Sequence, residues 1–326
     1  MMMKQHLKNS LTGLVVLVIG YAILGSLIGT GILNAYYAQI LIIVGINIIL
    51  ATALNLVIGF TGQLVLGFAG FMSVGAYTAA VMTMKLHLPL PAALVLGGVM
   101  ASIFGLIVGV PTLRLKGDYL AITTLGFGEI IRVIIVNIDA LGGPRGLPGI
   151  PKLTNFLWVY VVAAISVLII YNIIHSTHGR AMISVREDEI AAESMGISTT
   201  KAKIQAFAIA AFFAGVAGGL YGHYFMFIDP KSFDWLKSFE VVTFVVAGGM
   251  GSLSGSIFSA TILTILPEML RLLNLSKYRM LMYAILLLIL MLFRPQGLMG
   301  EKELSLRVFR NFGPKKPEVT KAGGEK

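Results

Sequence analysis

A long stretch without any formal charge is the feature that most constrains how this chain can fold. No Asp, Glu, Lys or Arg occurs from Asn9 to Met84. A helix needs about 20 apolar residues to cross roughly 30 Å of hydrocarbon, and an ionisable side chain inside lipid is costly. A charge-free stretch of this length therefore predicts several consecutive membrane-spanning helices rather than a water-soluble domain.

Apolar segments of similar length recur along the rest of the chain, which is 57% hydrophobic and only 12% charged. Both fractions lie far from those of an average soluble domain. We therefore predict an all-α fold, a polytopic inner-membrane helical bundle with about 8–10 transmembrane helices, some of them broken or short. The predicted segments are Leu11–Gly29, Tyr36–Ile58, Leu64–Met84, Ala92–Leu113, Tyr119–Ile138, Phe156–Ile174, Ile204–Phe227, Phe239–Ile265 and Arg279–Phe293.

The distribution of Lys and Arg predicts the orientation of the bundle, because these residues accumulate in cytoplasmic loops. Lys4 and Lys8 precede the first segment, which we interpret as a retained helix with a cytoplasmic N-terminus. Six crossings then return the chain to the cytoplasm at residues 179–203. The basic tail, residues 301–326, should also be cytoplasmic. This requires one additional crossing, which a helix break at Gly248–Gly255 would supply.

Residues 179–203 form a charged segment between long apolar neighbours. Within it, Ile190, Ala191 and Met195 can form the apolar face of a short amphipathic helix, and Gly196 is a typical helix stop. Such a helix either presents a docking surface to a cytoplasmic partner or belongs to an ordinary interfacial loop. The residue pattern by itself is compatible with both interpretations.

Several classes of function are disfavoured by what the sequence lacks. It has no Cys, which excludes disulfides and thiolate metal sites, and its His residues show no HExxH spacing. It has no G-x-x-x-x-G-K-[ST] loop for nucleotide binding. The net charge of +10 comes from loops and tail rather than from a basic-aromatic stripe, so nucleic acid is not a predicted partner. We expect no catalytic residue, metal or cofactor in this chain.

The charged segment resembles the coupling loop of ABC-importer permeases, whose motif contains Glu-Ala-Ala followed a few residues later by Gly. The counterpart here is Glu189-Ile190-Ala191-Ala192-Glu193-Ser194-Met195-Gly196, with one residue between the first Glu and the Ala pair. More specifically, the chain resembles the LivM-type permeases of branched-chain amino-acid importers in four blocks that occur in the family's order. These blocks are Asn55–Tyr77, Leu113–Arg132, the charged segment, and Gly248–Ser252 together with Phe293–Leu298.

The resemblance implies a transmembrane permease domain at residues 1–300, with a cytoplasmic coupling loop at 179–203, and a basic cytoplasmic tail at 301–326. It implies a sister permease, two ATP-binding cassette subunits, an extracytoplasmic solute-binding protein and membrane lipid as partners, with branched-chain amino acids as substrate. The residues expected to couple the chain to the ATPase are Arg186, Glu189, Ala191, Ala192, Glu193 and Gly196. Alternatives are a permease for urea or a small amide and, from a different class, an ion-coupled secondary transporter with Glu129 as proton site.

Three polar residues inside the predicted spans are candidates for the translocation pathway or for helix contacts. Glu129 and Arg132 share a helix face at i, i+3 spacing near mid-depth. We expect them to form an ion pair that faces the bundle interior, and we favour a clamp between helices over a gate. For Gln63, a pathway role and an interhelical hydrogen bond are equally compatible with the sequence.

Overall fold

The computed structural model describes residues 34–112, 114–115, 117–272, 285, 288 and 297–300. This part of the chain is almost entirely helical. Its α-helices are α2 (Ala35–Thr61), α3 (Phe68–Lys85), α4 (Leu90–Thr112), α5 (Asp118–Val136), α6 (Phe156–His175), α7 (Thr177–Glu187), α8 (Glu189–Ser194), α9 (Thr199–Phe225), α10 (Trp235–Gly248) and α11 (Leu253–Leu272). Short elements connect them: η1 (Asp139–Leu141), η2 (Gly143–Arg145), β1 (Leu147–Pro148), β2 (Phe227–Ile228) and η3 (Pro230–Phe233).

The helices confirm the all-α membrane bundle predicted from the apolar segments. Five of them, α2, α4, α5, α6 and α9, are long and apolar enough to cross a membrane. The shorter or less apolar α3, α10 and α11 pack among these five. The predicted span 11–29 and the tail 301–326 lie outside the described residues, as does the span 279–293 apart from 285 and 288.

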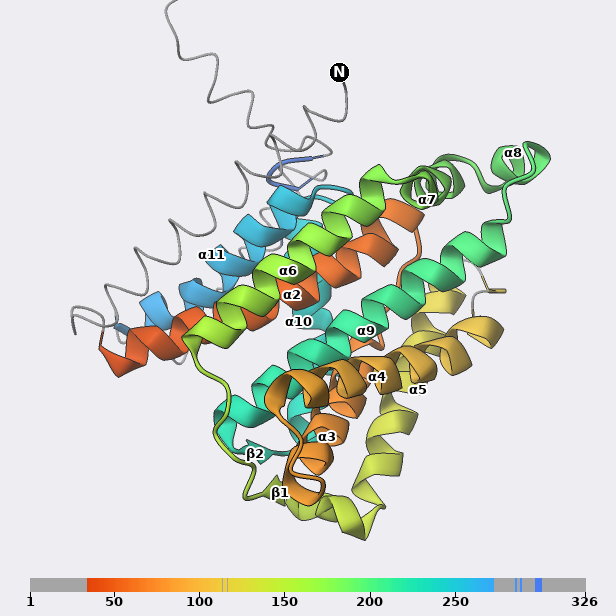
Figure 1. Ribbon diagram of the computed structural model, residues 1–326. Helices are drawn as coiled ribbons and strands as arrows, with labels where there is room; N and C mark the ends of the chain where they lie inside the picture. The colour runs from red at the N-terminus through yellow and green to blue at the C-terminus, as the bar shows by residue number, and fades with distance from the viewer. Residues whose placement is uncertain are drawn as a thin grey trace, which may run out of the picture.

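The bundle has two distinct ends (Figure 1). At one end α7 and α8 lie next to the start of α9, and at the opposite end β1 and β2 form a small antiparallel ladder. α2 ends close to α7. Gly62 terminates α2 in a left-handed conformation and lies against the side chain of Arg186. We call the end that contains α7 and α8 the charged end of the bundle.

Glycine allows α3, α4 and α9 to approach one another closely. A methyl group added at Gly75 of α3 would lie 2.1 Å from the Cα of Gly215 in α9, and one at Gly97 of α4 would lie 2.8 Å from the carbonyl oxygen of Gly75. Membrane helices associate through such contacts between small residues, because the hydrophobic effect does not favour helix association inside lipid. Within this group, α9 packs against α2, whose middle residues Ile49, Leu50 and Leu54 are fully buried.

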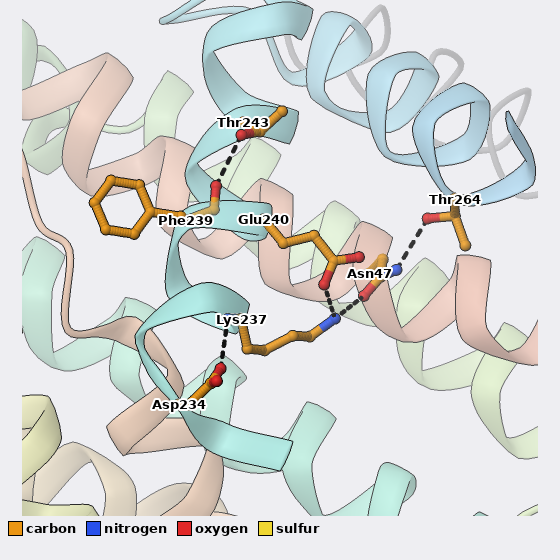
Figure 2. A network of polar contacts seen from close by, with 7 residues as sticks. All are labelled: Asn47, Asp234, Lys237, Phe239, Glu240, Thr243 and Thr264. Carbon is orange, nitrogen blue, oxygen red and sulfur yellow. Dashed lines mark hydrogen bonds and ion pairs between the residues drawn. The ribbon is translucent and has the colours of Figure 1, made fainter. Parts of the chain in front are cut away.

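α10 and α11 form an antiparallel hairpin that packs on α2. Asn47 of α2 accepts a hydrogen bond from Lys237, near the start of α10, and donates one to Thr264, in the second half of α11 (Figure 2). At the turn, a methyl group added at Gly248 would lie 2.5 Å from the backbone of Gly255. The chain therefore reverses within the predicted glycine-rich break. With 14 residues, α10 is about 21 Å long and too short to cross a bilayer alone.

The hairpin divides the apolar segment 239–265 into two antiparallel helices. Its turn lies at the charged end, because the N–H of Gly251 donates to Asn55 near the end of α2 at 3.0 Å. Residues 297–300 return to this end, where the N–H of Leu298 donates to the carbonyl of Ala247 at 2.8 Å. The charged segment and the residues that precede the basic tail thus lie at the same end of the bundle.

Candidate functional site

The charged segment folds mainly into α7 and α8, which are separated by one residue. This residue, Asp188, caps α8: its carboxylate accepts hydrogen bonds from the N–H groups of Ile190 at 2.9 Å and Ala191 at 3.0 Å. After α8, Gly196 adopts a φ of +81°, which favours glycine, and its N–H donates to the carbonyl of Glu193 at 2.9 Å. The short helix and the glycine stop predicted from the sequence are both present.

The outer surface of α8 and the residue that follows it expose two large apolar side chains. Ile190 and Met195 are 75% and 83% exposed, and Ala191 and Glu193 are exposed beside them. Ala192 points the other way and is buried. Single exposed apolar residues are common on protein surfaces. Here, however, two large ones lie on and next to a helix of six residues, at the end of the bundle that also carries the charged segment.

Glu189 is directed toward the protein rather than toward this outer surface. Its carboxylate accepts a hydrogen bond from the ammonium group of Lys203 in α9 at 2.6 Å, and the Lys203 side chain is only 12% exposed. A half-buried ion pair of this kind is screened less by solvent than a surface pair. The Glu189–Lys203 ion pair therefore holds α8 against the first turns of α9. Together with the buried Ala192, it keeps α8 oriented so that Ile190 and Met195 are exposed.

Arg186 connects α7 to the turn of the α10–α11 hairpin. Its Nη1 donates to the carbonyl oxygen of Gly59 in α2 at 3.0 Å, and its Nε donates to Glu187 at 3.0 Å. Nη1 lies so close to Gly251 that a methyl group added there would be 2.7 Å away. Asn55 secures the same turn by donating to the carbonyl of Ser252 at 2.9 Å. Arg186 and Asn55 thus both contact the turn between α10 and α11.

Glu129 and Arg132 form the predicted ion pair. Nη2 of Arg132 lies 2.8 Å from Oε2 of Glu129, and Nε of Arg132 donates to the same oxygen at 2.8 Å. Both residues belong to α5, and their side chains are 28% (Arg132) and 33% (Glu129) exposed. Among the described residues their only polar contact is with each other, so the pair does not link α5 to a second described helix.

Gln63 lies in the loop between α2 and α3 and is buried, with only 3% of its surface exposed. Neither its amide oxygen nor its amide nitrogen has a hydrogen-bond partner among the described residues. A buried polar group without a partner typically costs about 1–3 kcal/mol. The interhelical hydrogen bond considered for this residue is therefore absent from the described part of the chain.

A second membrane ion pair was not anticipated from the sequence. Nζ of Lys237 donates to Oε2 of Glu240 at 2.9 Å and to Oδ1 of Asn47 at 3.2 Å, while Nδ2 of Asn47 donates to Thr264 at 2.9 Å (Figure 2). Lys237 is partly buried, with an 18% exposed side chain. Its i, i+3 spacing to Glu240 is the signal that revealed Glu129 and Arg132, and it would have identified this pair too. The network joins α10, α2 and α11.

These features define a class of protein: a multi-pass helical membrane permease with a short helix at one end that exposes apolar side chains. The model of a family described as branched-chain amino acid transport system / permease component matches residues 36–291. The chain belongs to this family.

Individual relatives agree with this assignment. The chain is 39% identical over 264 residues to the high-affinity branched-chain amino acid transport system permease protein LivM of Salmonella typhimurium, and 37% identical to LivM of Escherichia coli K12. Each alignment covers 70% of this chain and 62% of the relative, so the chain matches less than two thirds of their length. The permease protein LivH of E. coli is 30% identical over 148 residues, 45% of this chain and 47% of LivH. No solved structure matches significantly.

Proposed function

We propose that this chain is the permease subunit of an ATP-driven importer that carries branched-chain amino acids across a bacterial or archaeal cytoplasmic (inner) membrane. Support comes from the family assignment and from the names of the LivM relatives. The proposed partners are a sister permease related to LivH, two ATP-binding cassette subunits and an extracytoplasmic solute-binding protein. ATP hydrolysis takes place on the cassette subunits, and this chain performs no covalent chemistry.

The observation that carries the proposal is the physical connection from the outer face of α8 to the hairpin turn. Ile190 and Met195, with Ala191 and Glu193, are exposed as a contact for the ATPase subunits. Glu189 and Ala192 hold α8 in place, and Gly196 ends it. Arg186 then transmits a movement of the docked subunits to the turn of α10 and α11. Nucleotide-driven closure shifts the population between two permease conformations only if such contacts differ between them.

The charged end is the cytoplasmic end in this proposal, and both termini are cytoplasmic. The chain contains no Cys, so single Cys residues at Ser198, which is exposed at the charged end, and at Ala322 in the tail report on topology directly. An impermeant thiol reagent added to intact cells should label neither position and should label both after permeabilisation. Cys at Ala140, exposed in η1 toward the opposite end of the bundle, serves as the control that the reagent labels from outside. Labelling of Ala322→Cys but not Ser198→Cys in intact cells would contradict the shared orientation.

The energy source separates the importer from the ion-coupled alternative. Proteoliposomes containing the complete complex, with ATP held constant inside and binding protein plus labelled leucine outside, should accumulate leucine in an ATP-dependent manner. Addition of a protonophore should leave uptake unchanged. Excess isoleucine or valine should compete with leucine, whereas urea should not. Uptake that persists without ATP and collapses with the protonophore would instead support a secondary transporter with Glu129 as its proton site.

Gln63 is the residue that we assign to the pathway itself. Both polar atoms of its amide are buried without a partner among the described residues, which is the condition expected of a group that bonds to a transient ligand. A polar group of a passing amino acid would satisfy the amide during part of the transport cycle. In this proposal Gln63 contributes to the passage of the polar backbone of the substrate rather than to recognition of its aliphatic side chain.

A further inference from the structure

The end of the bundle opposite the charged end is built from two connections that the β1–β2 ladder joins. Leu147 of β1 pairs with Ile228 of β2. A methyl group added at Gly146 would lie 2.5 Å from the carbonyl oxygen of Ile228, so the turn before β1 rests on β2. The connection from α5 to α6 and the connection from α9 to α10 therefore form one surface (Figure 1). We call residues 139–153 and 226–233 the ladder surface.

The backbone of the ladder surface requires water or protein around it. β1 and β2 form a two-stranded sheet, so each strand pairs on one side only. Open sheet edges and irregular loops do not face lipid chains, because their backbone groups would lack hydrogen-bond partners there. The ladder surface therefore lies beyond the hydrocarbon layer, and a side chain that is exposed on it faces water or another protein.

Met226 and Phe227 form an exposed apolar centre on the ladder surface. They are 47% and 42% exposed, and Phe227 pairs across the ladder with Pro148, which is also exposed. Isolated exposed apolar residues are common on protein surfaces. Two large neighbouring ones on a water-facing loop are instead typical of the centre of a protein interface, where aromatic residues and Met are enriched.

The backbone of Met226 is independent evidence that its side chain serves a contact outside this chain. Met226 ends α9 with a φ of +58°, a left-handed conformation that glycine adopts readily and other residues adopt rarely. His87, with a φ of +49°, is the other non-glycine case in the part of the chain that the structure describes. Glycine would end α9 at least as well, and the Met226 side chain is about half exposed, so burial does not explain it.

Three exposed cations lie close to this apolar centre. Arg145 precedes Gly146, where an added methyl group would lie 2.9 Å from the ring of Phe227. Lys231 follows β2 in η3, and Nζ of Lys152 lies 5.8 Å from the ring centroid of Tyr224 at the end of α9. None of the three forms an ion pair with another described residue. Lys and Arg concentrate on the cytoplasmic side of membrane proteins, so cations at the opposite end require a separate reason.

The carboxylates of the same two connections are less available at the surface than the cations. Asp229 is half-buried and accepts a hydrogen bond from a backbone N–H of η3 at 3.0 Å. Asp234 is also half-buried and accepts one from a backbone N–H of α10 at 3.1 Å. Only Asp139 is exposed among these three. The outward-facing charge of the ladder surface is therefore mainly positive.

We propose that the ladder surface is the place where the extracytoplasmic solute-binding protein docks. Met226 and Phe227 enter an apolar recess of that protein, and Arg145, Lys152 and Lys231 face carboxylates around the recess. The inference rests on the proposed function, which supplies the binding protein as partner and places the charged end in the cytoplasm. Opposite charges around an apolar contact steer the encounter and fix the orientation of the docked protein.

Association of the purified, leucine-loaded binding protein with the complete complex in nanodiscs tests the charged rim. Arg145→Glu and Lys231→Glu should each lower the association rate constant at least about fivefold at low salt, and added salt should reduce the difference from wild type. Lys201→Glu makes the same charge change at an exposed position of the charged end and should associate as wild type does. Wild-type association rates in both ladder variants, or an equal loss in Lys201→Glu, would overturn the proposal.

Met226→Gly tests the apolar centre without disturbing the fold. Glycine favours the positive φ at this position, so the Tm should be no lower than that of wild type, while dissociation of the binding protein should become several-fold faster. His87→Gly is the matched control, because it replaces the other non-glycine residue of positive φ outside the ladder surface. Unchanged dissociation in Met226→Gly, or faster dissociation that is accompanied by a lowered Tm or shared by His87→Gly, would refute a direct contact.

The same preparation separates this inference from the function on which it rests. If the leucine-loaded binding protein does not associate with the wild-type complex, the proposed function fails. If it associates with wild type and with every ladder variant equally, only the docking surface is wrong. A benzophenone amino acid at Phe227 in proteoliposomes should cross-link to the binding protein on illumination. Cross-links to lipid alone would show that the apolar centre contacts the membrane and would overturn the proposal.

Discussion

Arg186→Ala should uncouple ATP hydrolysis from transport while the complex still assembles. The substitution removes the hydrogen bond from Arg186 to the carbonyl of Gly59 and the contact of Arg186 with Gly251. α7 then no longer contacts the hairpin turn through this side chain. A hydrogen bond from a charged donor contributes about 1.5–3 kcal/mol. If that contact differs between the two permease conformations, its loss lowers substrate-stimulated ATPase activity and leucine uptake at least about tenfold. Both rates are measured in proteoliposomes with binding protein present.

Arg180→Ala is the matched control for this prediction. Arg180 lies on the same helix and is exposed, and its hydrogen bonds are local, to Thr177 at 3.1 Å and to the carbonyl of His175 at 3.4 Å. Its removal changes the net charge by the same amount without touching the hairpin, so coupling should remain near wild type. Equal behaviour of Arg180→Ala and Arg186→Ala would show that the contact of α7 with the turn does not carry the signal.

Gly75→Val should abolish the packing of α3 against α9 and with it the folded protein. Even the Cβ of a new side chain at Gly75 would lie 2.1 Å from the Cα of Gly215, and the atoms in the way belong to backbone, which cannot rotate aside. The two helices would have to move apart and would lose contacts along their length. Overpacking of a core commonly costs about 1–3 kcal/mol, and a backbone clash of this kind lies at or above that range. We expect a severe loss of purified complex and, for Gly75→Ala, a clearly lowered Tm.

Gly126→Ala controls for the general effect of replacing a helical glycine. Gly126 lies on the exposed face of α5, and a methyl group there meets nothing within 4 Å. Alanine is favoured over glycine in a helix by about 1 kcal/mol, so this variant should be as stable as the wild type or more so. A Tm for Gly75→Ala equal to that of Gly126→Ala would refute the close approach of α3 and α9.

The helices themselves could be predicted closely, whereas their exact starts depended on contacts that the sequence does not display. The apolar segment Leu64–Met84 was expected to be helical throughout, yet α3 begins only at Phe68. The residues between Gly62 and Gly67 form no regular secondary structure. Gly62 ends α2 in a left-handed conformation, and the N–H of Leu66 donates to Thr124 of α5 at 3.1 Å. A partner on another helix thus replaces the intrahelical bond that the apolar pattern predicted.

The candidate site shows the same division between local pattern and long-range contact. The i, i+3 spacing of Glu129 and Arg132 correctly predicted an ion pair, because that geometry is internal to one helix. It could not indicate which way the pair faces, and the expected clamp between helices is not seen among the described residues. Likewise, the motif located Glu189, but only the fold brings Lys203 to it, 14 residues further along the chain.

The sequence by itself determined the class of structure and the place of the short helix in the charged segment. Long apolar segments must become helices in lipid, since no water is present to satisfy the backbone, and a dense cluster of charges must leave the membrane. The sequence predicted a break at Gly248–Gly255, but only the tertiary structure decided that Arg186 and Asn55 contact this turn and that Lys237 bonds to Asn47 of α2. These relations join residues far apart in the chain. They depend on how closely glycine-rich helices can approach, and hydropathy along one segment contains no information about its neighbours in space.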